Sequence, residues 1–221
     1  AVPMLWERNY GKGRFVVNNH GMCEKVTRGL TAAAYSLLQD VFAYPVINSS
    51  VFFLDDFPSP VPMGNGEYIR KYFGRDISSF YSNIWWPDML KIAEKHGVRY
   101  TGVVIEDYSE RTSGTFPRTT DTERFRYFGG LLLEKGGEIG IHGYNHMPLC
   151  PDGFDFLGKV DYETWPTAND MRSAIAELMD FTKTLFPKNT ISTYVPPSNI
   201  LSAEGRAMLA ESFPEIRTLS G

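Results

Sequence analysis

From residue 44 onward, short apolar runs alternate with longer amphipathic segments, and this alternation limits the possible folds more than any other feature of the chain. A short apolar run bounded by turn residues predicts a buried strand, and a longer segment with apolar residues every three or four positions predicts a helix. Strands and helices that alternate in this way form parallel sheets, because each helix carries the chain back to the start of the next strand. The pattern therefore predicts an α/β fold.

Strands and helices can be assigned to particular segments of this region. The strand candidates are residues 46–54, 100–105, 138–142, 190–195 and 216–219, and the helix candidates are residues 86–96, 120–135, 167–186 and 202–212. Boundary signals support several helices: Thr120 and Glu123 form a capping-box pattern, Pro87 suits a first turn, and Gly97 and Gly136 suit helix ends. A right-handed series of such units closes into a barrel, with ligands at the carboxyl ends of its strands.

Residues 1–45 follow a different pattern. Two strand-like segments, residues 4–7 and 14–18, flank a turn at residues 10–13 and precede a helical stretch at residues 24–42. This order resembles the closing hairpin and helix of another α/β domain, such as an amidotransferase-like one. We therefore expect residues 1–45 to be an N-terminal extension or the tail of a preceding domain, and residues 46–221 to form the (β/α) barrel.

Charge and composition exclude some classes of partner. The 221 residues carry a net charge of −4, whereas binding to a phosphate backbone requires a basic face, so we expect no nucleic-acid partner. No apolar run approaches the roughly 20 residues that span a bilayer, and residues 1–20 lack the pattern of a signal peptide. Only Cys23 and Cys150 are present, so at most one internal disulfide is expected.

Polar residues follow the predicted strands at the ends where a barrel places its site. Asp55 and Asp56 end the apolar segment at residues 51–54. On an extended chain neighbouring side chains point in opposite directions, so one carboxylate can bind a cation while the other faces a substrate. A nearby cation would also keep both carboxylates ionised despite their mutual repulsion. The alternative is that the pair only caps a turn.

Two histidines follow the strand predicted at residues 138–142. His142 and His146 are four residues apart, and Pro148 disfavours a long helix there, so we place both on the strand end and the following loop. Neutral imidazole is a good ligand for zinc, cobalt and related divalent metals. Two of only four histidines in the chain, spaced in this way, favour a metal site over a polar contact in the core.

Taken together, these motifs resemble those of a known family. The Asp-Asp step after one strand, the later His-x-x-x-His and the Pro-Pro step after the next strand occur in the same order in the polysaccharide deacetylase (NodB-homology) family of carbohydrate esterases, from about residue 44 to the C-terminus. The resemblance implies a NodB-like distorted (β/α) barrel, which we expect to be incomplete at its C-terminus. The chain's departures from the family pattern resemble those of a divergent subgroup of the family whose function is uncharacterised.

The resemblance also implies roles for individual residues. Asp56, His142 and His146 would bind one divalent metal, zinc first and cobalt or nickel as alternatives, and Asp55 would be the general base. The backbone N–H of Ser198 would help to hold the oxyanion. Substrate-binding residues would be Tyr144, Tyr194, Pro196 and Pro197. The implied reaction is hydrolysis of N- or O-acetyl groups of a polysaccharide, at the bacterial cell envelope or outside the cell.

The chain departs from the family pattern at several positions. Phe57 and Pro58 follow the paired aspartates where the family usually has Gly, and Val195 stands where the family has an Arg that orients the catalytic aspartate. Arg70, Arg75 and Arg118 are the candidates to replace that Arg. The family's later histidine, the acid for the leaving group, has no counterpart before Gly221, and His96 is expected to be a solvated helix end.

These departures keep alternative functions open. One is a catalytically silent carbohydrate-binding pseudo-deacetylase that retains the metal and the cleft. Another is a glycoside hydrolase that uses Glu106 and Asp107, which follow the second predicted strand. The aromatic-rich segment at residues 72–86 is predicted to be an insertion, either a lid that stacks on sugars or a loop that packs its own rings onto the barrel.

Overall fold

The computed structural model of the chain describes residues 3–19, 28–39, 41, 50–58 and 66–220. Its internal contacts divide the chain into two compact units, Ala1–Ser50 and Val51–Gly221. The helix predicted at residues 24–42 and the strand predicted at residues 46–54 lie partly outside the described residues. Cys23 lies outside them entirely, whereas Cys150 is fully buried.

Among its described residues, the first unit contains a hairpin and one helix. β1 (Leu5–Tyr10) pairs antiparallel with β2 (Gly13–Asn18), and the turn between them includes Gly11 with a φ of +59°. Glycine adopts this left-handed conformation without the steric cost that a Cβ atom brings. α1 (Arg28–Leu38) follows, and the Arg14 guanidinium donates a 2.8 Å hydrogen bond to the carbonyl of Leu37 at its end. The predicted order of strand, turn, strand and helix is present.

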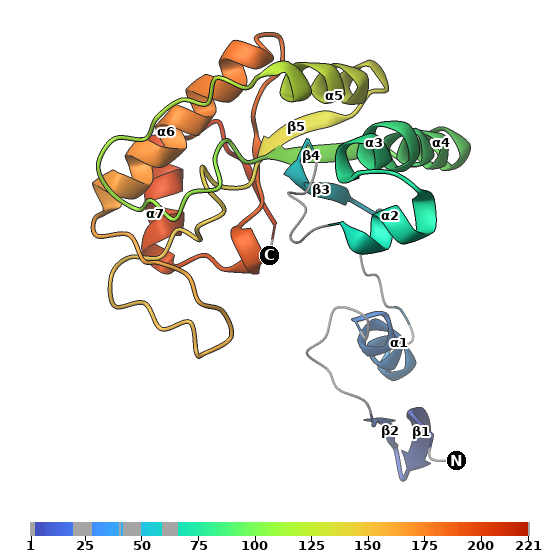
Figure 1. The fold of residues 1–221 in the computed structure, drawn as a ribbon. Helices are drawn as coiled ribbons and strands as arrows, with labels where there is room; N and C mark the ends of the chain where they lie inside the picture. The colour runs from blue at the N-terminus through green and yellow to red at the C-terminus, as the bar shows by residue number, and fades with distance from the viewer. Residues whose placement is uncertain (1–2, 20–27, 40, 42–49, 59–65, 221) are drawn as a thin grey trace. The chain divides into compact units, whose positions relative to one another are not determined.

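A parallel five-stranded sheet forms the centre of the second unit (Figure 1). Every neighbouring pair of its strands is parallel, so their carboxyl ends lie at the same edge. In the order of the sheet the strands are β3 (Phe52–Phe57), β4 (Tyr100–Val104), β5 (Glu138–Ile141), β6 (Thr193–Tyr194) and β7 (Thr218–Leu219). The prediction of an α/β fold is confirmed.

The four predicted helices are present with nearly the predicted bounds. They are α4 (Trp86–His96), α5 (Glu123–Glu134), α6 (Ala168–Leu185) and α7 (Ala203–Ser212). Gly97 ends α4 in the left-handed conformation, and exposed His96 lies in its last turn, as expected. The predicted capping box is wrong: α5 begins at Glu123, after Thr122, and no side chain caps it.

The aromatic-rich segment before α4 is helical. It consists of α2 (Glu67–Phe73), α3 (Ile77–Phe80) and the π-helical turn η2 (Tyr81–Trp85). The Asp76 side chain starts α3 by accepting a hydrogen bond from the Ser79 N–H, which satisfies a free donor of the first turn. Ring centroids of Phe73 and Phe80 are 4.7 Å apart. The segment is therefore helical and not an irregular loop, but its rings do pack on one another, as one of the two alternatives expected. A lid that stacks on sugars stays a prediction.

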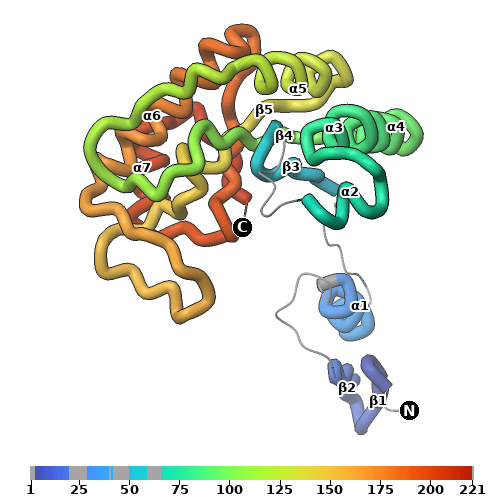
Figure 2. The backbone as a smooth tube through the Cα atoms, in the orientation of Figure 1, coloured from blue at the N-terminus to red at the C-terminus, as the bar shows by residue number. Residues whose placement is uncertain are grey.

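α6 supplies much of the core beside the sheet. Its buried residues recur every three or four positions along one face of the helix, which is the stripe that an amphipathic helix turns towards a core. They are Met171, Ala174, Ile175, Leu178, Met179, Phe181, Thr182 and Leu185. Two long loops, residues 105–122 and 142–167, follow the carboxyl ends of β4 and β5 (Figure 2).

Candidate metal centre

Asp55 and Asp56 lie in a bulge at the end of β3. The register with β4 passes from Leu54 opposite Gly102 to Phe57 opposite Val104, so β3 has one extra residue in this stretch. Asp56 has a φ of +54°, in the left-handed region that Asp and Asn enter more readily than most residues. The predicted extended alternation of the two aspartates is therefore wrong, and the bulge sets the direction of each carboxylate.

His142 and His146 lie on the strand end and loop, as predicted. His142 follows β5 directly, and its N–H donates a 2.8 Å hydrogen bond to the carbonyl of Val104 on β4. The chain then turns at Gly143, where a Cβ atom would be 3.2 Å from the Pro197 ring, and His146 has a φ of +61°. This tight turn brings the second imidazole back beside the first.

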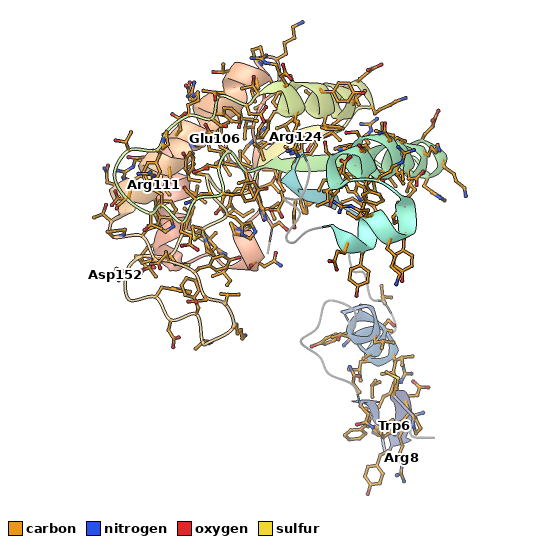
Figure 3. All side chains as sticks on the ribbon, in the orientation of Figure 1. Trp6, Arg8, Glu106, Arg111, Arg124 and Asp152 are labelled. Carbon is orange, nitrogen blue, oxygen red and sulfur yellow. The ribbon has the colours of Figure 1, made fainter. Side chains whose placement is uncertain are left out.

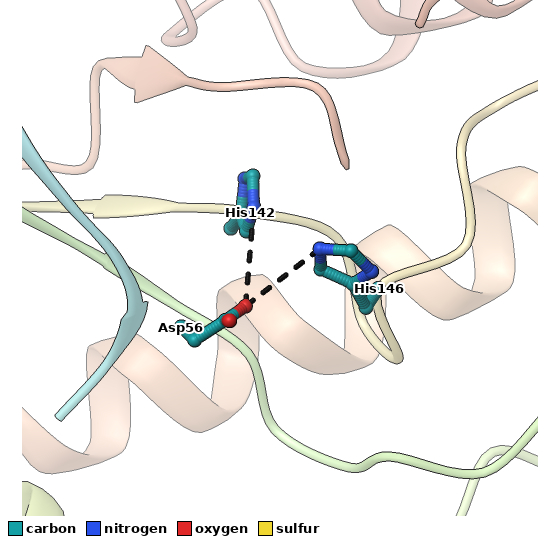
Figure 4. Close-up of side chains that lie close together, drawn as sticks. All are labelled: Asp56, His142 and His146. Atoms are coloured by element: carbon teal, nitrogen blue, oxygen red, sulfur yellow. Dashed lines mark ion pairs between the residues drawn. The ribbon is translucent and has the colours of Figure 1, made fainter. Parts of the chain in front are cut away.

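The side chains of Asp56, His142 and His146 converge (Figure 4). Asp56 Oδ1 lies 4.0 Å from His142 Nε2 and 3.7 Å from His146 Nε2, and one ligand atom of each residue lies within 4.8 Å of the other two. Bonds of roughly 2.0–2.2 Å to zinc place neighbouring ligand atoms roughly 3–3.5 Å apart. Small side-chain movements would close this difference, so the group could hold a metal ion.

The hydrogen bond that His142 makes through Nδ1 shows which ring nitrogen carries the proton. Nδ1 lies 2.7 Å from the carbonyl oxygen of Val195, and the contact is buried. A carbonyl oxygen only accepts hydrogen bonds, so Nδ1 must be the donor. In neutral His142 the lone pair is therefore on Nε2, which faces Asp56. A backbone acceptor on the outer nitrogen is the usual device for fixing a metal-binding histidine.

The donor atoms of Asp56, His142 and His146 face one another (Figure 4). Asp56 Oδ1 is buried and has no hydrogen-bond partner among the described residues. Burial lowers the pKa of His146, against the opposing effect of Asp56, so this imidazole tends to be neutral. A buried carboxylate oxygen that has no hydrogen-bond partner, beside the imidazoles of His142 and His146, is unfavourable unless a positive charge joins it. The chemistry of the donor set fits a divalent cation.

A tyrosine absent from the sequence prediction completes the surroundings of His146. Tyr162 Oη lies 3.2 Å from His146 Nδ1 and 2.7 Å from Ser198 Oγ. Tyr162 belongs to the long loop that follows β5, which shows neither helical nor strand periodicity. Its contact with His146 depends on the path of that loop, so no local pattern could have found it.

The remaining predicted site residues differ in exposure. Asp55 and Ser198 are exposed, and Ser198 has a φ of +51° with no hydrogen-bond acceptor for its N–H among the described residues. The predicted substrate-binding residues Tyr144, Tyr194, Pro196 and Pro197 are all buried. The Tyr144 hydroxyl donates a 2.6 Å hydrogen bond to the carbonyl of Pro117. Both tyrosine rings pack inside the protein, and substrate contacts for these four residues stay predictions.

None of the three arginines considered as partners for Asp55 forms an ion pair or hydrogen bond with it in the described part of the chain. Arg118 forms ion pairs with Glu177 and Asp180 on α6. Across the part of the chain that the structure describes, no side chain forms an ion pair or hydrogen bond with Asp55, so Arg70 and Arg75 do not hold it either. The suggestion that one of the three replaces the family's Arg is not supported.

Glu106 and Asp107 do not form an open pair of carboxylates. Glu106 is buried, and its Oε1 accepts a 3.0 Å hydrogen bond from the Thr119 N–H, whereas Asp107 accepts one from the Ser109 hydroxyl. Burial raises the pKa of Glu106 to about 8, against the lowering effect of the Thr119 N–H. Glu106 and Arg124, which are both labelled in Figure 3, line a pocket of about 190 Å³.

The fold and the site together define an α/β protein with a candidate metal centre at the carboxyl edge of a parallel sheet. The chain belongs to the family described as "Uncharacterised protein conserved in bacteria (DUF2194)", which it matches over residues 1–221. None of the curated proteins matches the sequence. Among the described helices, none combines the length and apolar character needed to cross a membrane.

Some solved structures are distantly similar to the chain. A CE4 family pseudoenzyme from Bacillus anthracis has 15% sequence identity and a TM-score of 0.42, covering 61% of this chain and 37% of its own. The chitin deacetylase from the fungal pathogen Colletotrichum lindemuthianum has 15% identity and a TM-score of 0.42, over 61% of this chain and 49% of its own. A family 4 acetyl xylan esterase from Clostridium thermocellum, in complex with a cobalt ion, has 14% identity and a TM-score of 0.40, over 57% of this chain and 51% of its own. The chain thus spans about half or less of each of these structures.

Proposed function

We propose that this protein is a metal-dependent hydrolase that removes N- or O-acetyl groups from a polysaccharide. The observation that carries the proposal is the convergence of Asp56, His142 and His146 on one point, with their ligand atoms within 4.8 Å of one another. The order of the three sequence motifs, which resembles that of polysaccharide deacetylases, supports the same reaction. A substrate at the bacterial cell envelope or outside the cell is part of this proposal.

The donor set decides which metal suits the site. One carboxylate oxygen and two imidazole nitrogens fit zinc, with cobalt or nickel as alternatives. With three protein ligands a site keeps open positions for reactants, and a cation bound there would act as a Lewis acid towards an acetyl carbonyl and lower the pKa of water. His142 is preset as a ligand, because its Nδ1–H is held by the carbonyl of Val195.

Two further residues would handle the proton and the developing charge. Asp55 is exposed beside Asp56 on the bulge, and its free carboxylate would accept the proton of the attacking water. The Ser198 N–H has no acceptor among the described residues and would donate a hydrogen bond to the oxyanion of the tetrahedral intermediate. As that intermediate collapses to acetate, the leaving nitrogen or oxygen of the sugar would take the proton that Asp55 accepted and become a free amine or hydroxyl.

Acetate release from acetylated chito-oligosaccharides and from aryl acetates, with zinc or cobalt added, tests the proposal. We expect turnover that a chelator abolishes. Asp55→Asn should bind zinc as the wild type does and lose turnover, because it removes the base alone. Asp56→Asn should lose zinc binding and turnover, because it removes a metal ligand. Turnover that is unchanged in Asp55→Asn, or that persists in excess chelator, would contradict the assigned roles.

One observation favours a second candidate, a catalytically silent carbohydrate-binding protein with the same metal centre. Val195 stands where the resembling family has an Arg, and no described side chain pairs with Asp55. A base that nothing orients is a poor catalyst, because proton transfer requires a fixed geometry. Saturable binding of acetylated oligosaccharides without acetate release, at saturating zinc, would identify this second function.

A further inference from the structure

Two hydroxyl groups form a hydrogen-bonded chain that leads away from His146. The Tyr162 hydroxyl lies 3.2 Å from His146 Nδ1 and 2.7 Å from Ser198 Oγ. Tyr162 lies on the loop between β5 and α6, and Ser198 lies in the turn η3 (Pro197–Asn199) after β6. Segments from two different strand ends therefore meet at one imidazole.

Counting protons shows that this chain can run in two directions. The Tyr162 hydroxyl has a single proton, so it can donate either to His146 Nδ1 or to Ser198 Oγ, but not to both. If it donates to Nδ1, neutral His146 carries its proton on Nε2 and has no lone pair towards Asp56. If it donates to Ser198, it can accept from Nδ1–H, and Nε2 is free to bind a metal.

We propose that Tyr162 is a positioning residue for the metal centre. Ser198 Oγ accepts the Tyr162 proton and so makes the Tyr162 oxygen the acceptor of a hydrogen bond from His146 Nδ1–H. This inference rests on the proposed metal centre. The carbonyl of Val195 can only accept, so it fixes His142 in one tautomer, whereas the Tyr162 hydroxyl can serve His146 either way. Ser198 Oγ therefore acts on a ligand that it does not touch.

The loop that carries Tyr162 is held at its base. The Trp165 N–H donates a 2.9 Å hydrogen bond to the carbonyl of Cys150, and the Asp152 N–H donates one of 2.9 Å to the carbonyl of Trp165. The buried Trp165 indole donates a further 2.8 Å bond to the carbonyl of Pro148. These hydrogen bonds join the two ends of the loop, so the segment that carries Tyr162 is anchored on both sides.

Zinc affinity of the full chain, measured by competition with a chromogenic chelator, tests the proposal with four variants. Tyr162→Phe keeps the ring and removes the hydroxyl, and should weaken zinc binding by roughly 10–100-fold, the usual effect of losing an outer hydrogen-bond partner of a ligand. Ser198→Ala should also weaken it, because the Tyr162 proton then turns to Nδ1. The double variant should bind like Tyr162→Phe alone. Tyr127→Phe, on the exposed side of α5, is the matched control and should bind like the wild type.

Non-additivity is the decisive result, since a merely structural effect of Ser198→Ala would persist in the Tyr162→Phe background. The visible spectrum of the Co²⁺-loaded protein should change in Tyr162→Phe and stay unchanged in Tyr127→Phe. Zinc affinity of Tyr162→Phe within about twofold of the wild type would overturn the proposal, because the expected loss is at least tenfold. If that variant does not fold, unchanged affinity in Ser198→Ala alone would overturn it.

The same titrations separate this inference from the proposed function. If the wild type binds zinc and the Tyr162 and Ser198 variants bind it equally well, the role of Tyr162 is overturned and the proposed metal centre is not. Zinc binding with the expected coupling but without acetate release supports the role of Tyr162 and overturns the hydrolase. A wild type that binds no zinc overturns both.

Discussion

His142 Nδ1 lies 2.7 Å from the carbonyl oxygen of Val195, and the two residues follow the ends of the neighbouring strands β5 and β6. Val195 stands where the resembling family has an Arg, so its side chain cannot orient Asp55, yet its backbone directs His142. The ligand geometry therefore depends on strand pairing: the Val195 N–H donates to the carbonyl of Ile141, the residue before His142. A change of side chain at position 195 leaves this contact in place.

Replacing Asp56 by Asn should separate metal binding from folding. Asn tolerates the φ of +54° and keeps the shape of the side chain, but it removes the charge. Zinc affinity should fall by more than the roughly 10–100-fold typical of an outer partner, since a direct ligand is lost. Stability without metal should not fall, because Oδ1 is buried without a partner. Calorimetric titration and thermal unfolding in chelator measure the two effects, with Asp55→Asn as the matched control. Equal zinc affinities in the two variants would contradict the assignment.

Zinc should stabilise the folded protein. A ligand at 100 times its Kd that binds only the folded state adds about 2.7 kcal/mol to the free energy of unfolding. For a unit of this size, that corresponds to a rise in Tm of roughly 5–11 °C. Differential scanning fluorimetry with zinc and then with excess chelator measures the rise and its reversal. A rise of the same size in His142→Ala would show that zinc binds elsewhere.

Two neighbouring glycines in α5 should respond in opposite ways to substitution by alanine. A Cβ atom on Gly129 would lie 2.3 Å from the buried Phe186 ring, so Gly129→Ala should lower the free energy of unfolding by about 1–3 kcal/mol. Gly130 has nothing within 4 Å, so Gly130→Ala should raise it by about 0.5–1 kcal/mol through helix propensity. Urea unfolding of both variants tests the packing of α5. Destabilisation of equal size in both would contradict it.

Glu106 should make stability depend on pH. Burial raises its pKa from 4.5 to about 8, so the folded protein holds a proton that the unfolded chain releases above about pH 4.5. The free energy of unfolding should fall as pH rises from about 4.5 to 8, with a slope of up to about 1.4 kcal/mol per pH unit. Glu106→Gln should remove this slope, matching the wild type near pH 5 and exceeding it at pH 8. Urea unfolding in chelator at several pH values checks this, and parallel profiles for the two proteins would refute it.

The order of the strands and helices could be predicted from the sequence more reliably than the conformation of the segments that connect them. Each strand and helix from β4 to α7 lies where its periodicity predicted it, although β6 is only Thr193–Tyr194 within the predicted residues 190–195. The helices α2, α3 and η2 were missed, because short aromatic-rich segments lack a clear period and were taken for a loop. In α5, the Thr120–Glu123 capping pattern has no counterpart in the structure, since the helix begins three residues later.

The residue types of the candidate metal centre were predictable, but their geometry was not. His142 and His146 follow a buried strand at a spacing that suits a metal, and the structure brings them to Asp56. The bulge at Asp56 depends on the register between β3 and β4, which no local pattern reports. Tyr162 comes from a long loop, and its contact with His146 arises only from the tertiary fold.

Metal content tests the central claim most directly. After incubation with zinc and removal of the unbound metal, elemental analysis of the full chain should find about one zinc per molecule in the wild type and none in His142→Ala, because the variant loses the ligand that the Val195 carbonyl holds in place. Tyr127→Phe serves as a control for handling and should match the wild type. A wild type without bound zinc at saturation, or a His142→Ala variant with the same zinc content as the wild type, would contradict the account.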